Sequence, residues 1–285
     1  MMPRVDLHVH SCCSDGVYSP RDLVALAANA GIRVLALCDH DNIDGVLPAV
    51  QAGIELGVEV LSGVELSCVW NDYADVHLLG YGFDVRHEGL QQSLRDFQRF
   101  RARRSERMLE KINDLLSRRG EAPVALTALL ERAGGSIGRP HLAMALMERG
   151  LVGTMEEAFR DYLIPCNEPK RFFPVEEAIA LIRSAGGVAV LAHPPYITRD
   201  HEAMKRLLEV LAGEGLQGLE AYNNGVNCTE LEWYLAQARY RKLLVTGGSD
   251  FHGIEEGNAE LGRIRSIGDI PYTCVEQLQA ALGNS

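Results

Sequence analysis

Short apolar runs alternate with segments of helical periodicity along most of this 285-residue sequence, and this alternation is the feature that most constrains the fold. The first apolar run covers residues 5–9, and a helical segment over 20–29 follows it and ends before Gly31. Strands are expected over 5–9, 34–38, 58–61, 64–69, 77–83, 188–192, 219–222 and 243–246, and helices over 20–29, 44–56, 175–184, 201–211 and 229–238. Repeated βα units join parallel strands, so we predict an α/β fold with a mostly parallel sheet, either a barrel or an open wound sheet.

The alternation stops in the middle of the chain. Residues 86–172 contain helical patterns over 90–118, 124–133, 141–149 and 155–162 and no convincing strand. We therefore predict that residues 1–85 and 173–285 form one catalytic barrel domain, and that 86–172 is a helical insertion that caps the substrate, since insertions sit on loops near the functional face.

Charge and cysteine content exclude several classes of protein. The sequence holds 28 basic and 39 acidic residues, a net charge of −11, which argues against a protein that binds duplex DNA through a broad basic face. No signal peptide and no uncharged apolar segment of about 18 residues is found, so we expect a cytoplasmic protein without a membrane partner. The seven cysteines include no Cys-x-x-Cys pair, which predicts reduced, mostly structural thiols.

Histidines and acids gather at the predicted strands. His8 and His10 are two residues apart on one strand, so their side chains share a face. The other members of this pattern are Asp15, the run Asp39-His40-Asp41, Glu65, His77, His193, and the run Asp250-Phe251-His252, whereas His87, His141 and His201 fall outside it. Because barrel and wound-sheet enzymes build their sites at the carboxyl ends of strands, these segments are expected to converge.

Six imidazoles and three carboxylates exceed what one tetrahedral ion needs, so the pattern predicts a site for two or three divalent metal ions. A single histidine at a strand end is more often a structural, hydrogen-bonded residue, but this explanation fits six such histidines poorly. Nitrogen and oxygen donors without sulfur suit Mn²⁺, which we favour, and also Zn²⁺ or Fe²⁺.

The ordered motifs resemble those of the PHP superfamily, named after polymerase and histidinol phosphatase domains. They are Asp6-Leu7-His8-Val9-His10-Ser11, Asp39-His40-Asp41, Gly63-Val64-Glu65, Ala192-His193-Pro194 and Ser249-Asp250-Phe251-His252. The resemblance implies a distorted (β/α)7 barrel with a trinuclear metal centre. It also implies a first metal on His8, His10, Glu65 and Asp250, a second on Glu65, His77 and His193, and a third on Asp15, His40 and His252. Many family members have histidine at the position of Asp15, so this chain departs from the pattern there.

The helical insertion and the short C-terminal half resemble most the subgroup that contains nucleoside 3′,5′-bisphosphate phosphatase and RNase AM. This implies removal of the 3′-phosphate from a nucleoside 3′,5′-bisphosphate such as pAp, which leaves a 5′-nucleotide such as AMP. Alternatives are 5′ to 3′ cleavage of short RNA, another small phosphate ester such as histidinol phosphate, a noncatalytic PHP module, and a C–N hydrolase with a His-x-His metal site. No lysine occurs in the first 110 residues to serve as the carboxylated lysine of such a C–N hydrolase, which favours the phosphoesterase.

The expected mechanism needs no side-chain nucleophile, because clustered divalent ions acidify water and stabilise charge on a phosphoryl group. We expect a hydroxide that bridges the first two metals to attack phosphorus. Glu65 would bridge these metals, and His193, His40 and His252 would lie close to the phosphate, so these four residues are the predicted catalytic set.

Arginines in the insertion are candidates for phosphate binding, since guanidinium groups suit phosphate oxygens. Arg99, Arg101, Arg103, Arg104 and Arg107 form a run, followed later by Arg139, Lys170 and Arg171. A solvated helix face explains any single member of the run as well, and only part of it can meet one ligand. We favour Arg103 and Arg104 in the run, together with Arg139 and Arg171.

Two asparagines complete the candidate substrate contacts. Asn223 and Asn224 follow the predicted strand 219–222 and are predicted to hydrogen-bond a ribose or base, although turn formation explains an Asn-Asn-Gly run equally well.

Overall fold

The computed structural model describes residues 3–132, 138–253 and 260–283. Its strands are β1 Arg4–Val9, β2 Ile32–Leu37, β3 Glu59–Trp70, β4 Tyr73–Tyr81, β5 Phe173–Pro174, β6 Val188–Leu191, β7 Gly218–Tyr222, β8 Leu244–Gly247, β9 Arg263–Ile264 and β10 Gly268–Asp269. Its α-helices are α1 Pro20–Asn29, α2 Val46–Leu56, α3 Glu88–Arg118, α4 Leu126–Arg132, α5 Arg139–Glu148, α6 Met155–Ala158, α7 Val175–Ser184, α8 His201–Gly213, α9 Cys228–Arg241 and α10 Thr273–Gly283. A π-helical turn, Phe159–Leu163, follows α6, and a 3₁₀ turn, Pro194–Tyr196, follows β6.

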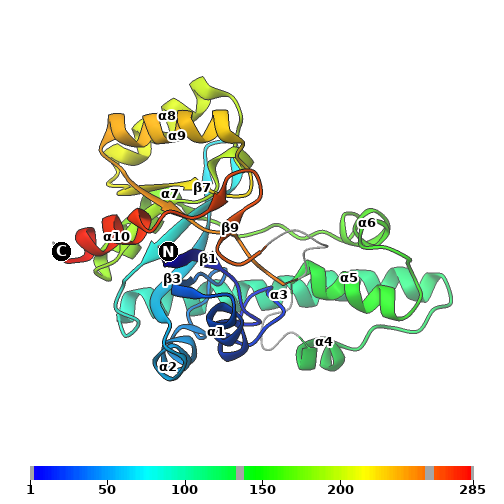
Figure 1. The fold of residues 1–285 in the computed structure, drawn as a ribbon. Helices are drawn as coiled ribbons and strands as arrows, with labels where there is room; N and C mark the ends of the chain where they lie inside the picture. The colour runs from blue at the N-terminus through cyan, green and yellow to red at the C-terminus, as the bar shows by residue number, and fades with distance from the viewer. Residues whose placement is uncertain (1–2, 133–137, 254–259, 284–285) are drawn as a thin grey trace.

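The main sheet is curled, with helices outside it, as the predicted α/β barrel fold requires. Seven strands run in the order β1-β2-β3-β4-β6-β7-β8, and β5 pairs with β3. The sheet curls back on itself, because the isolated parallel bridge Val9↔Phe251 joins the end of β1 to the segment after β8. In Figure 1, α8 and α9 lie on one side of the strands and α1 and α2 on the other.

One strand runs against the predicted parallel arrangement. β4 pairs antiparallel with both β3 and β6. The cause is a tight turn, since only two residues separate Trp70 from Tyr73 and Asn71 adopts a positive φ of 49°. A parallel connection needs a crossover of about a dozen residues or more, which this turn cannot provide. The predicted pieces 58–61 and 64–69 are one continuous strand, β3.

The helix boundaries follow local capping chemistry. Ser19 caps α1 by accepting a hydrogen bond from the backbone N–H of Asp22, and Pro20 occupies the first helical turn. Asp200 caps α8 by accepting from the backbone of Glu202 and Ala203. Helices α1 and α7 cover the predicted residues 20–29 and 175–184. The predicted helix over 155–162 is instead the short α6 followed by the π-helical turn.

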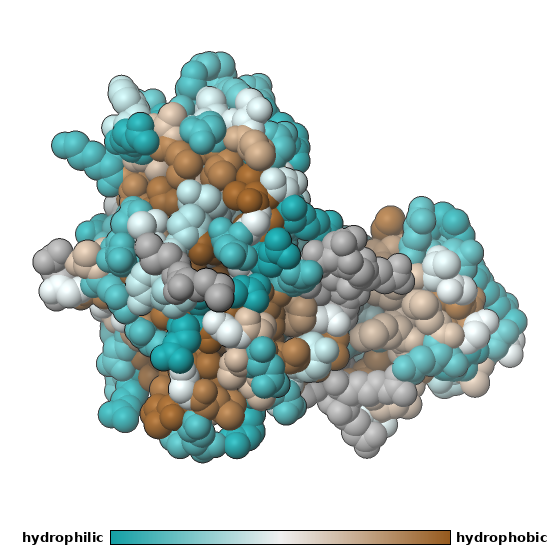
Figure 2. Space-filling model, in the orientation of Figure 1, coloured by the Kyte–Doolittle hydropathy of each residue, from teal (hydrophilic) through white to brown (hydrophobic). Residues whose placement is uncertain are grey.

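Separate clusters of buried residues support the two parts of the chain. Inner residues of β1, β2, β4 and β6 pack with α10, an element that the sequence patterns did not predict. In the insertion, the C-terminal half of α3 packs with α4, α5, α6 and the π-helical turn around buried residues such as Met108, Leu142 and Leu146. Figures 1 and 2 show this helical lobe projecting to one side of the barrel. None of the described helices is long and apolar enough to cross a membrane.

Candidate metal centre and adjoining pocket

The structure brings the nine predicted ligand residues together at one end of the barrel. The first group of ligand atoms belongs to His8, His10, Glu65 and Asp250, and these atoms lie within 4.8 Å of one another. His10 Nε2 lies 3.0 Å from Asp250 Oδ1 and 3.3 Å from Glu65 Oε2, and His8 Nε2 lies 3.3 Å from Glu65 Oε2. This set is the one expected for the first metal.

Glu65 stands between the first group and a second one. Its Oε2 faces the first group and also lies 3.1 Å from His40 Nδ1. Its Oε1 lies 2.8 Å from His77 Nδ1 and 2.9 Å from His193 Nε2, and these two nitrogens are 3.3 Å apart. The two oxygens of one carboxylate therefore face two different clusters of nitrogen donors, as a bridging ligand requires.

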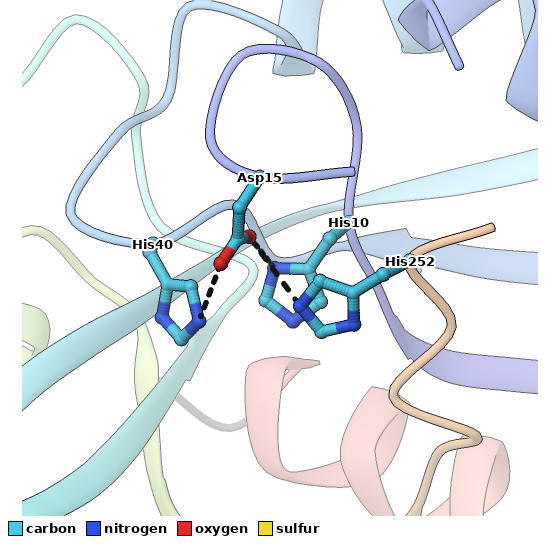
Figure 3. Close-up of side chains that lie close together, drawn as sticks. All are labelled: His10, Asp15, His40 and His252. Atoms are coloured by element: carbon cyan, nitrogen blue, oxygen red, sulfur yellow. Dashed lines mark ion pairs between the residues drawn. The ribbon is translucent and has the colours of Figure 1, made fainter. Parts of the chain in front are cut away.

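Asp15 anchors a third group, which Figure 3 shows with its carboxylate between the rings of His40 and His252 and near His10. Asp15 Oδ1 lies 3.3 Å from His252 Nε2 and 3.9 Å from His10 Nδ1, and Oδ2 lies 3.7 Å from His40 Nε2. These residues come from the loops after β1, β2 and β8. Aspartate at position 15 thus reaches the same cluster as the other predicted ligands.

The irregularities of the backbone aim these side chains. Asp6 and Val9 of β1 pair with Leu35 and Leu37 of β2, so one extra residue bulges β1 around His8. Among the non-glycine residues with positive φ in the described chain are Asp41 at 51°, His193 at 24° and Asp250 at 56°. Such conformations are uncommon for these residues and collect at functional sites.

The donor atoms fit divalent cations. Buried atoms without a hydrogen-bond partner among the described residues include His10 Nδ1, His40 Nδ1, Glu65 Oε2 and His193 Nδ1. His8 Nε2 and His10 Nε2 face each other at 3.1 Å, an arrangement that a shared cation would stabilise. Buried polar atoms normally have hydrogen-bond partners, so this concentration of nitrogen and oxygen atoms without them indicates metal ligands.

Electrostatics at the site also favour a cation. Burial lowers the pKa of His8, but Glu220, Glu65 and Asp250 outweigh it and raise that pKa well above the usual range. Burial raises the pKa of Glu65, yet the neighbouring histidines hold it well below its ordinary value. At His40 burial dominates and lowers the pKa of the imidazole to about 3. Glu65 is thus ionised and His40 neutral, the forms in which each binds metal, whereas the acids around His8 favour its protonated form, whose proton a bound ion would replace.

Glu220, on β7, orients two of the candidate ligands and was missed by the sequence reasoning. Its Oε1 accepts a hydrogen bond from His8 Nδ1 at 2.9 Å, which leaves His8 Nε2 directed at the cluster. Its Oε2 accepts from the backbone N–H of His193 at 2.7 Å. The sequence signal for Glu220 was an acid within the otherwise apolar strand Gly218–Tyr222, because a carboxylate is buried only where it has hydrogen-bonding partners.

A pocket of about 390 Å³ opens from the metal centre toward the insertion. Asp15, His40 and His77 line one end, and its other residues are Asp41, Ser67, Phe97, Phe100, Arg101, Arg104, Ser105, Gly138, Arg139, Pro140, Phe159, Lys170 and Arg171. Five of these side chains are cationic, and all five come from the insertion. Of the predicted arginines, Arg104, Arg139 and Arg171 therefore lie in the pocket.

Arg103, the fourth arginine favoured from the sequence, does not line the pocket. Its side chain is exposed on α3, whereas Arg101 and Arg104 on the same helix line the pocket. Arg104 also supports the lobe, since its Nε donates to the Glu168 carbonyl and its Nη2 to Asn167 Oδ1, both at 2.8 Å. Arg101, which the sequence reasoning did not favour, takes the place expected of Arg103.

Asn223 and Asn224 are engaged by backbone groups. Asn223 donates to the Glu220 carbonyl and accepts from the N–H of Gly225, both close to it in the sequence. Asn224 instead contacts two other segments, since it donates to the Ser249 carbonyl after β8 and accepts from the N–H of Arg265 after β9. Neither lines the pocket, so Asn223 corresponds to the turn-forming alternative, Asn224 joins separate loops, and neither makes the predicted substrate contacts there.

Comparison with known proteins agrees with this geometry. The PHP domain family matches residues 6–167. The chain is 35% identical over 269 residues to a 5′-3′ exoribonuclease of Haemophilus influenzae, covering 92% of this chain and 94% of the relative. It is 31% identical over 292 residues to a 3′,5′-nucleoside bisphosphate phosphatase of Chromobacterium violaceum, covering 96% and 94%.

Solved structures share the whole fold. A crystal structure described as a candidate metal-dependent phosphoesterase of Bifidobacterium adolescentis superposes with a TM-score of 0.83 at 30% identity, covering 99% of this chain and 97% of the other. A structure from Chromobacterium violaceum, described as an amidohydrolase with bound sulfate and no metal, gives a TM-score of 0.80 at 29% identity, covering 98% and 96%.

The chain belongs to the PHP domain family. It is a metal-dependent phosphoesterase of the PHP type, a hydrolase, and the clusters around Glu65 are groups that could hold its metal ions.

Proposed function

We propose that this protein hydrolyses the 3′-phosphate of nucleoside 3′,5′-bisphosphates and releases a 5′-nucleotide and phosphate. The observation that carries the proposal is the pocket between the metal centre and the insertion. Its lining combines candidate metal ligands of the barrel with five cationic side chains of the insertion, of which Arg101 lies next to the ligands, 3.4 Å from Asp41 Oδ2. A substrate that carries two phosphates, one at the metals and one on the remaining cations, matches this combination of charges.

The size and lining of the pocket also support a nucleotide. A volume of about 390 Å³ is in the range of small-ligand sites. Phe97, Phe100 and Phe159 also line the pocket and offer apolar surface for a base or ribose. Arg139 and Arg171 are the arginines to which we assign the 5′-phosphate, with Arg101 and Arg104 beside them. In this proposal residues 86–172 form the lobe that caps the substrate, and residues 1–85 and 173–285 form the catalytic barrel.

We assign the ligands as the family resemblance implies: a first ion on His8, His10, Glu65 and Asp250, a second on Glu65, His77 and His193, and a third on Asp15, His40 and His252. His10 also lies with the third set, and His40 also lies with Glu65 and His77. Bound divalent ions would supply Lewis acidity toward the phosphoryl group and its attacking water. Manganese is our first choice, with zinc or iron as alternatives, because the donors are nitrogen and oxygen. Within this set, His193, His40 and His252 are the side chains proposed to lie closest to the phosphate being removed, and Glu65 holds the two clusters together.

Cleavage of short RNA from its 5′ end is the second candidate, and the Haemophilus influenzae relative favours it. The chemistry of the two reactions is closely related. Each breaks the bond between O3′ and phosphorus on a nucleoside that carries a 5′-phosphate. They differ in whether another nucleotide is attached to that phosphorus, so the same anchoring of the 5′-phosphate serves both.

The test is to incubate the Mn²⁺-loaded protein separately with pAp and with the 5′-phosphorylated dinucleotide pApA, and to identify products by chromatography with a phosphate assay. We expect pAp to give AMP and phosphate with the higher kcat/KM. Faster conversion of pApA to two molecules of AMP would favour the exoribonuclease. A His10→Ala, Asp250→Ala double variant is the blank, and no turnover of either substrate by metal-bound protein would refute both.

A further inference from the structure

Three buried aspartates around the metal centre make the same pair of hydrogen bonds, each with one serine. In every case one carboxylate oxygen accepts the serine backbone N–H and the other accepts the serine hydroxyl. The pairs are Asp6 with Ser249 (2.9 and 2.6 Å), Asp39 with Ser11 (2.8 and 2.7 Å) and Asp41 with Ser67 (2.8 and 2.8 Å). We call these pairs the serine–aspartate clamps.

The clamps follow one another around the barrel. Asp6 on β1 joins Ser249 after β8, Ser11 after β1 joins Asp39 after β2, and Asp41 after β2 joins Ser67 on β3. The clamped segments are those that carry six of the nine candidate ligands: His8, His10, His40, Glu65, Asp250 and His252. Two of the clamp serines, Ser11 and Ser249, are direct sequence neighbours of His10 and Asp250.

The clamps lie where regular strand pairing ends. The β2–β3 ladder stops at the pair Leu37↔Ser62, three residues before His40 and Glu65, which meet in a single isolated bridge. Between β8 and β1 the isolated bridge Val9↔Phe251 takes the place of a ladder among the described residues. Beyond the regular ladders, backbone pairing is reduced to a few hydrogen bonds, such as Asp41 N–H to Glu65 O at 2.8 Å and Asp250 N–H to His8 O at 2.9 Å. The clamps add side-chain hydrogen bonds between the same segments.

Further contacts tie each clamp to its surroundings. Asp39 Oδ1 also accepts from Ser14 Oγ at 2.6 Å, and Asp6 Oδ2 accepts from the N–H of Gly262 at 2.7 Å. Asp41 Oδ2 lies 3.4 Å from Arg101 Nη1, so this clamp touches a cation of the substrate pocket. All three carboxylates are buried.

From this repeated geometry we propose that Asp6, Asp39 and Asp41, with their serines, are positioning residues that hold the strand ends at the spacing the metal ions require. The inference deepens the proposed function, because it concerns the same metal centre, but it is independent of the substrate. An aspartate suits this task and an asparagine does not, since both carboxylate oxygens act as acceptors and the amide nitrogen of asparagine cannot accept.

The test uses Ser67→Ala, Ser11→Ala and Ser249→Ala, each of which removes one hydroxyl and keeps the backbone N–H. The readout is Mn²⁺ affinity and stoichiometry, measured by isothermal titration on protein without substrate. We expect each variant to bind Mn²⁺ about 10- to 100-fold more weakly, the usual effect of losing a residue that orients ligands. Ser62→Ala is the matched control, because Ser62 lies on β3 and its hydroxyl donates to the Phe83 carbonyl at 3.0 Å, away from the ligands.

A double-variant cycle separates positioning from general damage. Asp41→Asn, Ser67→Ala and their combination should lose affinity by similar factors, because either change alone disables the same clamp. Metal-free melting temperatures of these variants should stay close to that of Ser62→Ala, and Ser67→Thr, which keeps the hydroxyl, should restore binding. Wild-type Mn²⁺ affinity in all three serine variants, or additive losses in the cycle, would overturn the inference and leave the proposed function intact. Failure of the wild-type protein to bind any of Mn²⁺, Zn²⁺ and Fe²⁺ would instead refute the proposed function.

Discussion

The barrel and the helical insertion use charge in different ways. At the end of the barrel, histidines and carboxylates are buried and packed within about hydrogen-bond distance of one another, and many of their atoms lack a partner. In the insertion, cationic side chains line an open pocket and lie next to aromatic rings, such as Arg139 over Phe159 and Arg171 over Phe97. In the function that we propose, the barrel holds the cations and the insertion receives the anionic substrate.

This contrast suggests a division of work. The candidate ligands come from the barrel strands and the loops that follow them, whereas the cationic residues of the pocket come from a lobe with its own buried core. Changes in the barrel should therefore alter the chemical step, and changes in the insertion should alter the choice of substrate. Each prediction below tests one side of this contrast, in order of decreasing effect.

Metal removal should have the largest effect. We expect chelation to abolish turnover of pAp and added Mn²⁺ to restore it. It should also lower the melting temperature, since an ion present at 100 times its Kd stabilises the folded state by about 2.7 kcal/mol. Calorimetry with and without chelator, together with elemental analysis, measures both. Full activity in protein shown to be metal-free would end the assignment of chemistry to the barrel.

Glu65→Gln should have the second largest effect on activity. The substitution keeps the shape of a fully buried side chain but removes the charge that faces both clusters. We expect kcat to fall more than about 1,000-fold, equivalent to about 4 kcal/mol of transition-state stabilisation, with loss of bound metal. Single-turnover kinetics and metal analysis check this. A variant that keeps its metal content and its activity would contradict the bridging role of Glu65.

Arg139→Gln tests the insertion side of the contrast. Loss of a charge-assisted hydrogen bond costs about 1.5–3 kcal/mol, so KM for pAp should rise about 10- to 100-fold while kcat changes little. KM for 3′-AMP, which has no 5′-phosphate, should stay within about twofold. The matched control is Arg103→Gln, an exposed arginine outside the pocket, which should leave both KM values unchanged. An equal rise for both substrates would remove the assigned role of Arg139.

Leu146→Ala tests whether the lobe has an independent core. Leu146 is buried between α5 and its neighbours, and truncation of such a leucine costs about 2–5 kcal/mol. We expect a higher KM for pAp but unchanged Mn²⁺ affinity. Leu79→Ala, at a buried site in the barrel, should instead weaken Mn²⁺ binding. The same loss of Mn²⁺ affinity in both variants would show that the two cores act as one.

Asn224→Ala should have the smallest effect. Its amide joins the loops after β7 and β8 to the turn after β9, and it does not line the pocket. We expect a loss of about 1–2 kcal/mol in the free energy of unfolding and less than a twofold change in KM for pAp. Denaturant titration and steady-state kinetics measure these quantities. A tenfold rise in KM would return Asn224 to the substrate site.

The sequence predicted the fold class and the gathering of candidate ligands well, for identifiable physical reasons. His8 lies on β1 and His10 directly follows it, and short parallel strands bring their carboxyl ends to one place, so local pattern and topology lead to the same residues. His77 was predicted with the other ligands but reaches the site in another way. It lies in the middle of the antiparallel strand β4, so the rule that sites form at the carboxyl ends of parallel strands does not explain its position.

The remaining features depend on orientation that local patterns do not encode. Arginine spacing on α3 gives the stripes of that helix but not its rotation against the barrel, which is why Arg101 lies in the pocket and Arg103 does not. Glu220 lies beside His8 only because the curled sheet brings β7 and β1 together, two strands that do not pair with each other. For Asn223 and Asn224 the residue types allowed a turn or a ligand contact, and the structure shows a turn for Asn223 and contacts with two other loops for Asn224.

The most direct test of this division of work is a comparison of pAp with 3′-AMP on one preparation of Mn²⁺-loaded protein, with the phosphate lost from pAp located by ³¹P NMR. We predict that kcat/KM for pAp exceeds that for 3′-AMP by at least about tenfold and that the 5′-phosphate is retained in the product. Equal kcat/KM values, or release of the 5′-phosphate, would contradict the claim that the barrel cleaves and the insertion selects.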